Sequence, residues 1–197
     1  MSKNNLNRGM ELKTQYFVQY SNDSIINRFV IPKETFTSIS IGIRNVGTDF
    51  IFPLVQNMFS FPIFFVLEND IFEQGKSIIS ERNIPSYKFS SNGFIIKIES
   101  VDTLEAICDI SVDLALNGIS VFIFFGQGLY DEDLVPLTQW NKPIEFKNLD
   151  FQKVETFIDV SEVGTTIFSR NNKFNSPRKV SYFISASYFL DIENSDI

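Results

Sequence analysis

The sequence contains no histidine, and this absence restricts its chemistry more than any other feature. Histidine is the usual general base near neutral pH and the commonest protein ligand of transition metals. Without it, the chain cannot build a Ser-His-Asp or Cys-His nucleophile, a zincin motif or a two-histidine iron site. Catalysis would have to use carboxylates, lysine, tyrosine or a metal held by oxygen ligands alone. The sequence therefore favours a protein that is not an enzyme.

Cysteine is almost absent: Cys108 is the only one, so the chain forms no intramolecular disulfide and no cysteine-based zinc site. No apolar run reaches the roughly 18–20 residues that span a bilayer. Residues 1–15 lack the apolar segment of a signal peptide. We expect a cytoplasmic protein with no membrane partner and no cofactor. Frequent Phe and Ile, whose codons are AT-rich, favour a bacterial or phage origin.

Positive charge is scarce, with 17 basic residues against 24 acidic ones and a net charge of −7. Nucleic-acid-binding proteins gain most of their affinity by neutralising phosphates, so we do not expect a nucleic-acid partner. An acidic surface can instead attract a basic protein.

The chain is long enough, and apolar enough at 44%, to fold as one domain. We expect residues 1–13 to form a flexible N-terminal tail and residues 14–197 to form a single globular domain. Two continuous apolar runs, residues 61–67 and 119–125, predict central strands that are covered on both faces.

Other strands are indicated by alternating apolar residues and by turn residues. Residues 36–43 alternate with a period of two, which is typical of a half-buried strand. Asn92-Gly93, within residues 86–100, predicts a hairpin with a two-residue type I′ turn. Further strands are expected in residues 14–31, as a hairpin, in 156–170, and in 179–193, where a helix is the alternative.

Helices are predicted over residues 48–60, 68–83 and 101–118. Thr48 or Asp49, Asp70, and Asp102 with Glu105 are the expected N-terminal caps, and Asn117-Gly118 is the expected end of the third helix. Together these elements predict an α/β or α+β fold, a single layered domain with a mixed β-sheet, two or three helices and β-hairpins.

Gly126-Gln127-Gly128 follows the second apolar run and raises the question of a phosphate-binding loop. A dinucleotide fingerprint needs a third glycine, and this chain has Asp131 there. That carboxylate would repel the pyrophosphate. We expect the two glycines to let the strand turn out of the sheet.

Acidic residues follow both apolar runs: Glu68 and Asp70 after the first, and Asp131, Glu132 and Asp133 after the second. If the two strands were parallel neighbours, these acids would meet at the carboxyl edge of the sheet. Oxygen ligands suit Mg²⁺ or Ca²⁺, so Glu68, Asp70, Asp131 and Asp133 are weak candidate metal ligands. The simpler interpretation is that they are solvated turn residues.

The helix predicted at residues 101–118 carries an acidic stripe formed by Asp102, Glu105, Asp109 and Asp113. No Lys or Arg occurs between residues 98 and 141 to offset it. Like charges four apart destabilise a helix by about 0.2–0.5 kcal/mol per pair. The stripe is either a solvated face or a surface for a basic partner, and the acidic turn Asp131–Asp133 is expected to extend that surface.

A basic segment, Arg170 to Lys179, contains four cations and no acid. It indicates a loop that contacts an acidic surface of the same or another chain, and less readily a phosphate or an RNA. Cys108 is expected to be a buried structural thiol. Trp140 could belong to the core or to an interface.

These observations favour a non-catalytic cytoplasmic protein-binding domain, such as an immunity or inhibitor protein that neutralises a basic partner. A carboxylate-based Mg²⁺- or Ca²⁺-dependent hydrolase is one alternative. A subunit of a phage or homo-oligomeric assembly is another, in which part of the phenylalanine content would lie in an interface.

Overall fold

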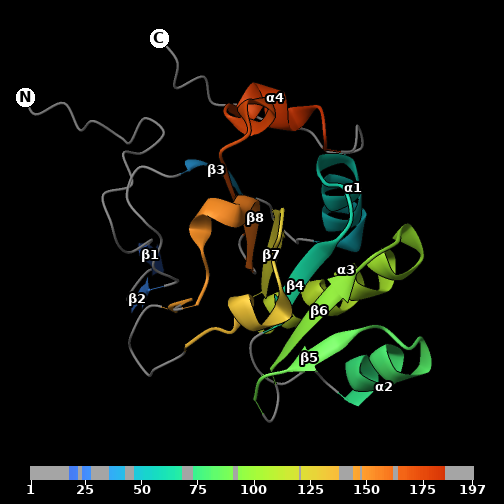
Figure 1. Ribbon diagram of the computed structural model, residues 1–197. Coiled ribbons are helices and arrows are strands. Elements are labelled where there is room, and N and C mark those ends of the chain that lie inside the picture. Colours follow the sequence, from blue (N-terminus) through green and yellow to red (C-terminus); the bar gives the residue numbers. More distant parts are fainter. Residues whose placement is uncertain are drawn as a thin grey trace, which may run out of the picture.

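The computed structural model describes residues 18–21, 24–27, 36–42, 47–67, 73–90, 93–119, 121–137, 144–146, 148–161 and 164–184. These residues form a layered α+β domain in which helices pack on a seven-stranded sheet (Figure 1). The predicted fold class is therefore confirmed. The expected N-terminal tail, residues 1–13, lies outside the described residues.

The sheet has the strand order β3-β9-β8-β7-β4-β6-β5. Its strands are β3 (Thr37–Gly42), β4 (Ile63–Leu67), β5 (Ser86–Lys88), β6 (Phe94–Ile98), β7 (Val121–Gly126), β8 (Val154–Ser161) and β9 (Gly164–Ser169). A separate hairpin, β1 (Val18–Ser21) with β2 (Ser24–Asn27), matches the one predicted in residues 14–31.

All six neighbouring pairs in the large sheet are antiparallel, so the expectation of a mixed sheet is wrong. The reason lies in the central strand β4, which separates β6 from β7. Because β6 and β7 both run opposite to β4, they are parallel to each other without being neighbours. The helix between them in the chain, α3 (Val101–Leu116), makes the crossover from one side of β4 to the other.

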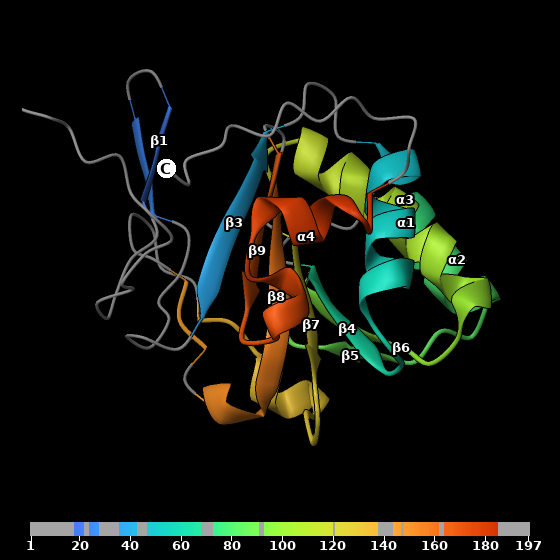
Figure 2. The ribbon, with the colours of Figure 1, turned by 90° about the horizontal axis from the view of Figure 1, so that it is seen from above.

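One face of the sheet is covered by helices (Figure 2). These are α1 (Thr48–Met58), α2 (Glu73–Glu81), α3 and α4 (Pro177–Ser181), and each contributes residues to a single apolar cluster. Strand β4 is buried along its whole length, as the continuous apolar run predicted. Residues 179–181 are helical, so in this part of 179–193 the helical alternative holds.

The opposite face carries a second apolar cluster rich in phenylalanine, covered by Leu129, Leu134 and segments near residue 146. Phe157 stacks between Phe124 and Phe168, with ring centroids 5.4 and 4.6 Å apart. The largest fully buried side chains of the described residues include seven phenylalanines. In this part of the chain, the phenylalanine content belongs to the core and not to an exposed interface.

Several predicted turns and caps differ in detail. The β5–β6 hairpin is confirmed, with Lys88 paired to Phe94 and Phe89 N donating to Gly93 O at 3.1 Å. Asn92 of the predicted type I′ turn lies outside the described residues. Helix α3 begins one residue after Ser100, which places Asp102 inside the first turn and not at the cap. Helix α1 likewise follows Gly47. The cap predicted at Asp70 lies outside the described residues.

The two glycines at the end of β7 and just after it act as expected. A Cβ at Gly126 would lie 2.0 Å from the carbonyl oxygen of Lys153, so only glycine lets β7 approach β8 there. Gly128 has a φ of +68°, a left-handed conformation that favours glycine. Together they take the chain out of the sheet and into the short 3₁₀ turn Asp131–Leu134.

Candidate binding surface

The most prominent polar surface is the outer face of α3, where Asp102, Glu105, Asp109 and Asp113 are all exposed. At about 100° per residue, these four carboxylates fall within about 80° of arc around the helix axis. The opposite side of α3 is fully buried, with Leu104, Ile107 and Leu114 in the core between helices and sheet. We call the four carboxylates the acidic face of α3.

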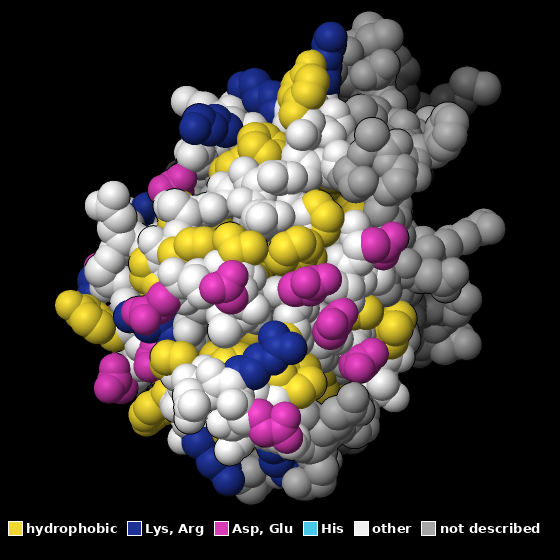
Figure 3. Space-filling view, turned by 90° about the vertical axis from the view of Figure 1, so that its right-hand side faces the viewer, with side chains coloured by type: hydrophobic (Ala, Val, Ile, Leu, Met, Phe, Trp, Pro, Cys, Tyr) yellow, Lys and Arg dark blue, Asp and Glu magenta, His cyan; other side chains and the backbone are white. Residues whose placement is uncertain are grey.

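The acidic face of α3 is not neutralised from within the described part of the chain. No ion pair there involves any of its four carboxylates; those found join Lys97 to Glu99 and Lys153 to Asp133. The one side-chain partner is Thr48, whose hydroxyl donates a hydrogen bond to Asp109 Oδ1. Figure 3 shows acidic side chains gathered across the middle of the side of the molecule that carries α3.

Apolar residues are exposed at both ends of α3. Val101 is 40% exposed and Leu116 is 48% exposed. Leu116 follows Asp113 by three residues, which places it on the same face as the carboxylates. The face therefore combines negative charge with apolar area that a partner could cover.

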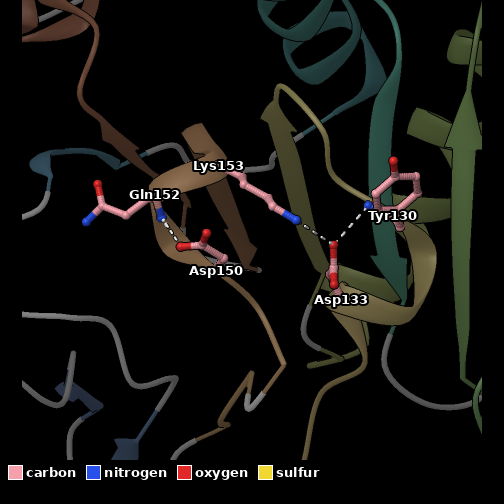
Figure 4. A network of polar contacts seen from close by, with 5 residues as sticks. All are labelled: Tyr130, Asp133, Asp150, Gln152 and Lys153. Carbon is pink, nitrogen blue, oxygen red and sulfur yellow. Dashed lines mark hydrogen bonds and ion pairs between the residues drawn. The ribbon is translucent and has the colours of Figure 1, made fainter.

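The turn after β7 uses its carboxylates differently. Asp133 Oδ2 accepts a hydrogen bond from Tyr130 N at 3.2 Å and lies 3.8 Å from Lys153 Nζ, so it closes its own turn (Figure 4). Burial raises the pKa of the Asp131 carboxyl, the charge of Glu132 adds to this, and the charge of Lys97 opposes it. Of the three acids, Glu132 is exposed, whereas Asp131 and Asp133 are half-buried.

The acidic turn and α3 pack on opposite faces of the sheet. Leu134 of the turn packs in the phenylalanine-rich cluster on one face of the sheet. Leu104 of α3 packs in the helix-covered cluster on the other face. This packing does not join the two groups of carboxylates, and the expectation that Asp131, Glu132 and Asp133 extend the surface of Asp102, Glu105, Asp109 and Asp113 stays a prediction.

The strand arrangement also removes the basis of the candidate metal site. β4 and β7 are antiparallel, and Leu67 at the end of β4 pairs with Val121 at the start of β7. The ends of the two strands thus point to opposite edges of the sheet, so the shared edge expected for Glu68, Asp70, Asp131 and Asp133 does not exist. Glu68 and Asp70 lie outside the described residues, within which no group of three acidic, Cys or His residues could hold a metal ion.

The basic segment at residues 170–179 has two kinds of cation. Arg170 donates to the carbonyl oxygens of Phe151 and Gln152, and its guanidinium lies 4.9 Å from the centroid of the Phe36 ring. Burial lowers its pKa. Lys179 Nζ donates to Asn172 O and Asn175 Oδ1 at 2.8 and 2.9 Å. These two cations stabilise the loop itself.

Lys173 and Arg178 belong to the second kind. Both are exposed, and among the contacts of the described residues neither side chain has a partner. Tyr182, 76% exposed, follows Arg178 by four residues at the end of α4. We call Lys173, Arg178 and Tyr182 the basic face of α4.

Two further features carry no chemistry. Cys108 is fully buried, and burial raises the pKa of its thiol, as do the charges of Asp109 and Glu105, which agrees with a structural role. Trp140 lies outside the described residues.

A polar pocket of about 510 Å³ lies where β7, β8 and β9 meet, and its lining includes Gln127, Glu155, Arg170 and Asn171. Sequence reasoning missed it because only the sheet brings these distant residues together. Its groups largely bond to one another, as Asn171 Nδ2 does to Glu155 Oε1 at 2.6 Å.

Comparison with protein-family models, with curated proteins and with solved structures gave no match. Among the described residues, no helix is both long and apolar enough to cross a membrane. The fold and the surface thus define a layered α+β domain with an acidic helix face that no described residue neutralises by an ion pair.

Proposed function

We propose that this protein is a non-catalytic cytoplasmic binding domain that holds a basic protein partner against the acidic face of α3. An immunity or inhibitor protein that neutralises a basic toxin or nuclease is the concrete version of this function. The observation that carries it is the exposure of four carboxylates on one helix face without an ion pair from the described residues.

This arrangement of carboxylates destabilises the helix. Asp109 has a like charge four residues away on each side, in Glu105 and Asp113, and each such pair costs about 0.2–0.5 kcal/mol. Asp113, near the C-terminus of α3, is also opposed by the helix dipole. Cations of a basic partner beside these carboxylates would offset both the repulsion between them and the unfavourable interaction with the helix dipole.

The dimensions of the face suit a partner that presents a row of cations. Eleven residues separate Asp102 from Asp113, so at 1.5 Å per residue the carboxylates extend over about 17 Å. Charge of one sign on such a surface accelerates association by steering the partner, while Leu116 offers apolar area for contact after docking.

The two alternative functions gain no specific support. The metal-dependent hydrolase depended on parallel neighbouring strands, and β4 and β7 are antiparallel. The assembly subunit depended on phenylalanines at an interface, and the described ones pack in the two core clusters. We therefore carry forward only the binding function.

The test is a charge reversal of the acidic face of α3 by Glu105→Lys, Asp109→Lys and Asp113→Lys together. The partner is captured from extract of the source cells with the wild-type chain, and its association is then measured at several salt concentrations. We expect the triple variant to associate at least about tenfold more slowly and with a flatter salt dependence.

Glu132→Lys is the matched control, because it reverses an exposed acid on the other side of the sheet and should leave the association rate nearly unchanged. Circular dichroism confirms that each variant is folded. An unchanged on-rate for the folded triple variant would show that the acidic face of α3 does not bind the partner.

A further inference from the structure

Two segments of the chain carry charge of a single sign. Residues 164–184 contain Arg170, Lys173, Arg178 and Lys179 and no acid, whereas residues 98–141 contain no Lys or Arg. In the fold, the first segment ends in α4 and the second includes α3, and the two helices lie at different places on the molecule (Figure 1). In Figure 3, basic side chains lie at the end where α4 lies, and acidic ones gather across the middle, where a few basic side chains also lie, as they do at the opposite end.

The two charged surfaces do not satisfy each other within one chain. Among the described residues, no ion pair connects α3 with α4 or with the loop before α4. Lys173 and Arg178 project from η3 (Asn172–Phe174) and α4, whose cores are anchored by Phe174 and Val180. The basic face of α4 is thus held in place, while Lys173 and Arg178 have no side-chain partner among the described residues.

The composition of the basic face of α4 is that of an interaction surface. Arg and Tyr are the residues most often found at the energetic centres of protein interfaces, together with Trp. Arg178 and Tyr182, four residues apart, lie one turn from each other on the same side of the helical end. A planar guanidinium in this setting suits a carboxylate, which it can bind with two parallel hydrogen bonds.

We infer that the basic face of α4 docks onto the acidic face of α3 of a second copy of this chain. The contact joins two different surfaces, so it is heterologous, and a pair of copies leaves one acidic and one basic face free for further copies. The inference rests on the proposed binding role of α3 and adds a consequence: self-association and the basic partner compete for the same carboxylates. The association is weak, because surface ion pairs contribute about 0.2–1 kcal/mol each, and sensitive to salt.

The test uses the full chain and two charge-reversed variants in sedimentation velocity at rising protein concentration. The first variant is the α3 triple described above, which is basic on both faces. The second is Lys173→Glu with Arg178→Glu, which is acidic on both. We expect the wild-type chain to self-associate at low salt, each variant alone to associate at least about tenfold more weakly, and an equimolar mixture of the two to associate again.

The mixture is the decisive arm, because loss of folding or of solubility cannot restore an interaction. Arg82→Glu with Lys88→Glu is the matched control: it changes the net charge by the same amount on exposed residues near β5 and should associate like the wild type. The second variant should still bind the captured partner, which separates failure of this inference from failure of the proposed function.

Four results would overturn the inference. Three of them are a wild-type chain that stays monomeric at low salt, a mixture no more associated than its components, and a control that loses association as fully as the second variant. If Lys173→Glu with Arg178→Glu changed the sedimentation equally at every protein concentration, the basic face of α4 would instead contact an acidic segment of the same chain, such as residues 191–197. That result would overturn the inference as well.

Discussion

The acidic face of α3 and the acidic turn after β7 contain the same residue types but differ in what those residues contact. On α3, the carboxylates project outward from a helix whose other side is buried, and among the described residues only Asp109 has a side-chain partner. In the turn, Asp133 caps the backbone at Tyr130 and faces Lys153. A carboxylate that stabilises its own fold is less available for a partner. For a carboxylate that destabilises its helix, a role in binding explains why it is there. We therefore assign binding to α3 and structure to the turn.

The largest expected effect concerns how tightly the turn is built. Gly126→Ala would place a Cβ 2.0 Å from Lys153 O, so the two strands must separate, and we expect the free energy of unfolding to fall by about 3 kcal/mol. Gly128→Ala is the matched control. Nothing lies within 4 Å of its Cβ, and only the left-handed φ of +68° opposes the change, at about 1 kcal/mol.

Urea denaturation of the two variants measures this difference. Equal losses would mean that the backbone of Gly126 does not approach β8 as closely as the structure shows. In that case close packing of β7 on β8 would not hold the turn in place, and the difference between a structural turn and a binding helix would be weaker.

The next prediction tests the comparison directly, because removing one carboxylate from the turn and one from α3 should change the free energy of unfolding in opposite directions. Asp133→Ala removes the acceptor of Tyr130 N and the charge beside Lys153, and we expect a loss of about 1 kcal/mol in the free energy of unfolding. Asp113→Ala removes repulsion from Asp109 and an unfavourable interaction with the helix dipole. It should stabilise the chain by about 0.5 kcal/mol.

Both variants remove one negative charge, so a general effect of net charge would act equally on them. Thermal or urea unfolding at low salt distinguishes the two signs. A destabilising Asp113→Ala would mean that this carboxylate has a structural role, and the case for keeping it available to a partner would fail.

Much of the fold could be predicted from the sequence where one physical requirement dominates. A continuous apolar run such as residues 61–67 must be covered on both faces, and β4 is central and buried. The exposure of the acidic face of α3 followed from helical periodicity, because Leu104, Ile107 and Leu114 occupy the opposite side.

What could not be predicted depends on contacts between distant segments. Whether β4 and β7 run in the same direction is decided by the placement of β6 beside β4, and no local pattern encodes this. The candidate metal site failed for that reason. Ser100 and Asp102 are both good helix caps two residues apart, so packing of the first turn, and not cap preference, decides where α3 begins. The two charged faces are local features, but their lack of mutual contact is a property of the fold.

The smallest expected effect concerns the pH dependence of the acidic turn. Burial raises the pKa of Asp131 in the folded chain above its unfolded value of about 4. Between these two pKa values the folded chain binds more protons than the unfolded chain, so the contribution of Asp131 to stability falls as the pH rises above about 4. Asp131→Asn removes this loss, and its stability relative to the wild type should be higher at pH 6–7 than near pH 3.5, as measured by urea denaturation. Lys97→Gln should instead enlarge this loss of stability, because the charge of Lys97 favours the ionised form of the Asp131 carboxyl. If Asp131→Asn changed stability equally at both pH values, Asp131 would behave as a solvated residue. The turn would then resemble the acidic face of α3 more closely than its contacts indicate.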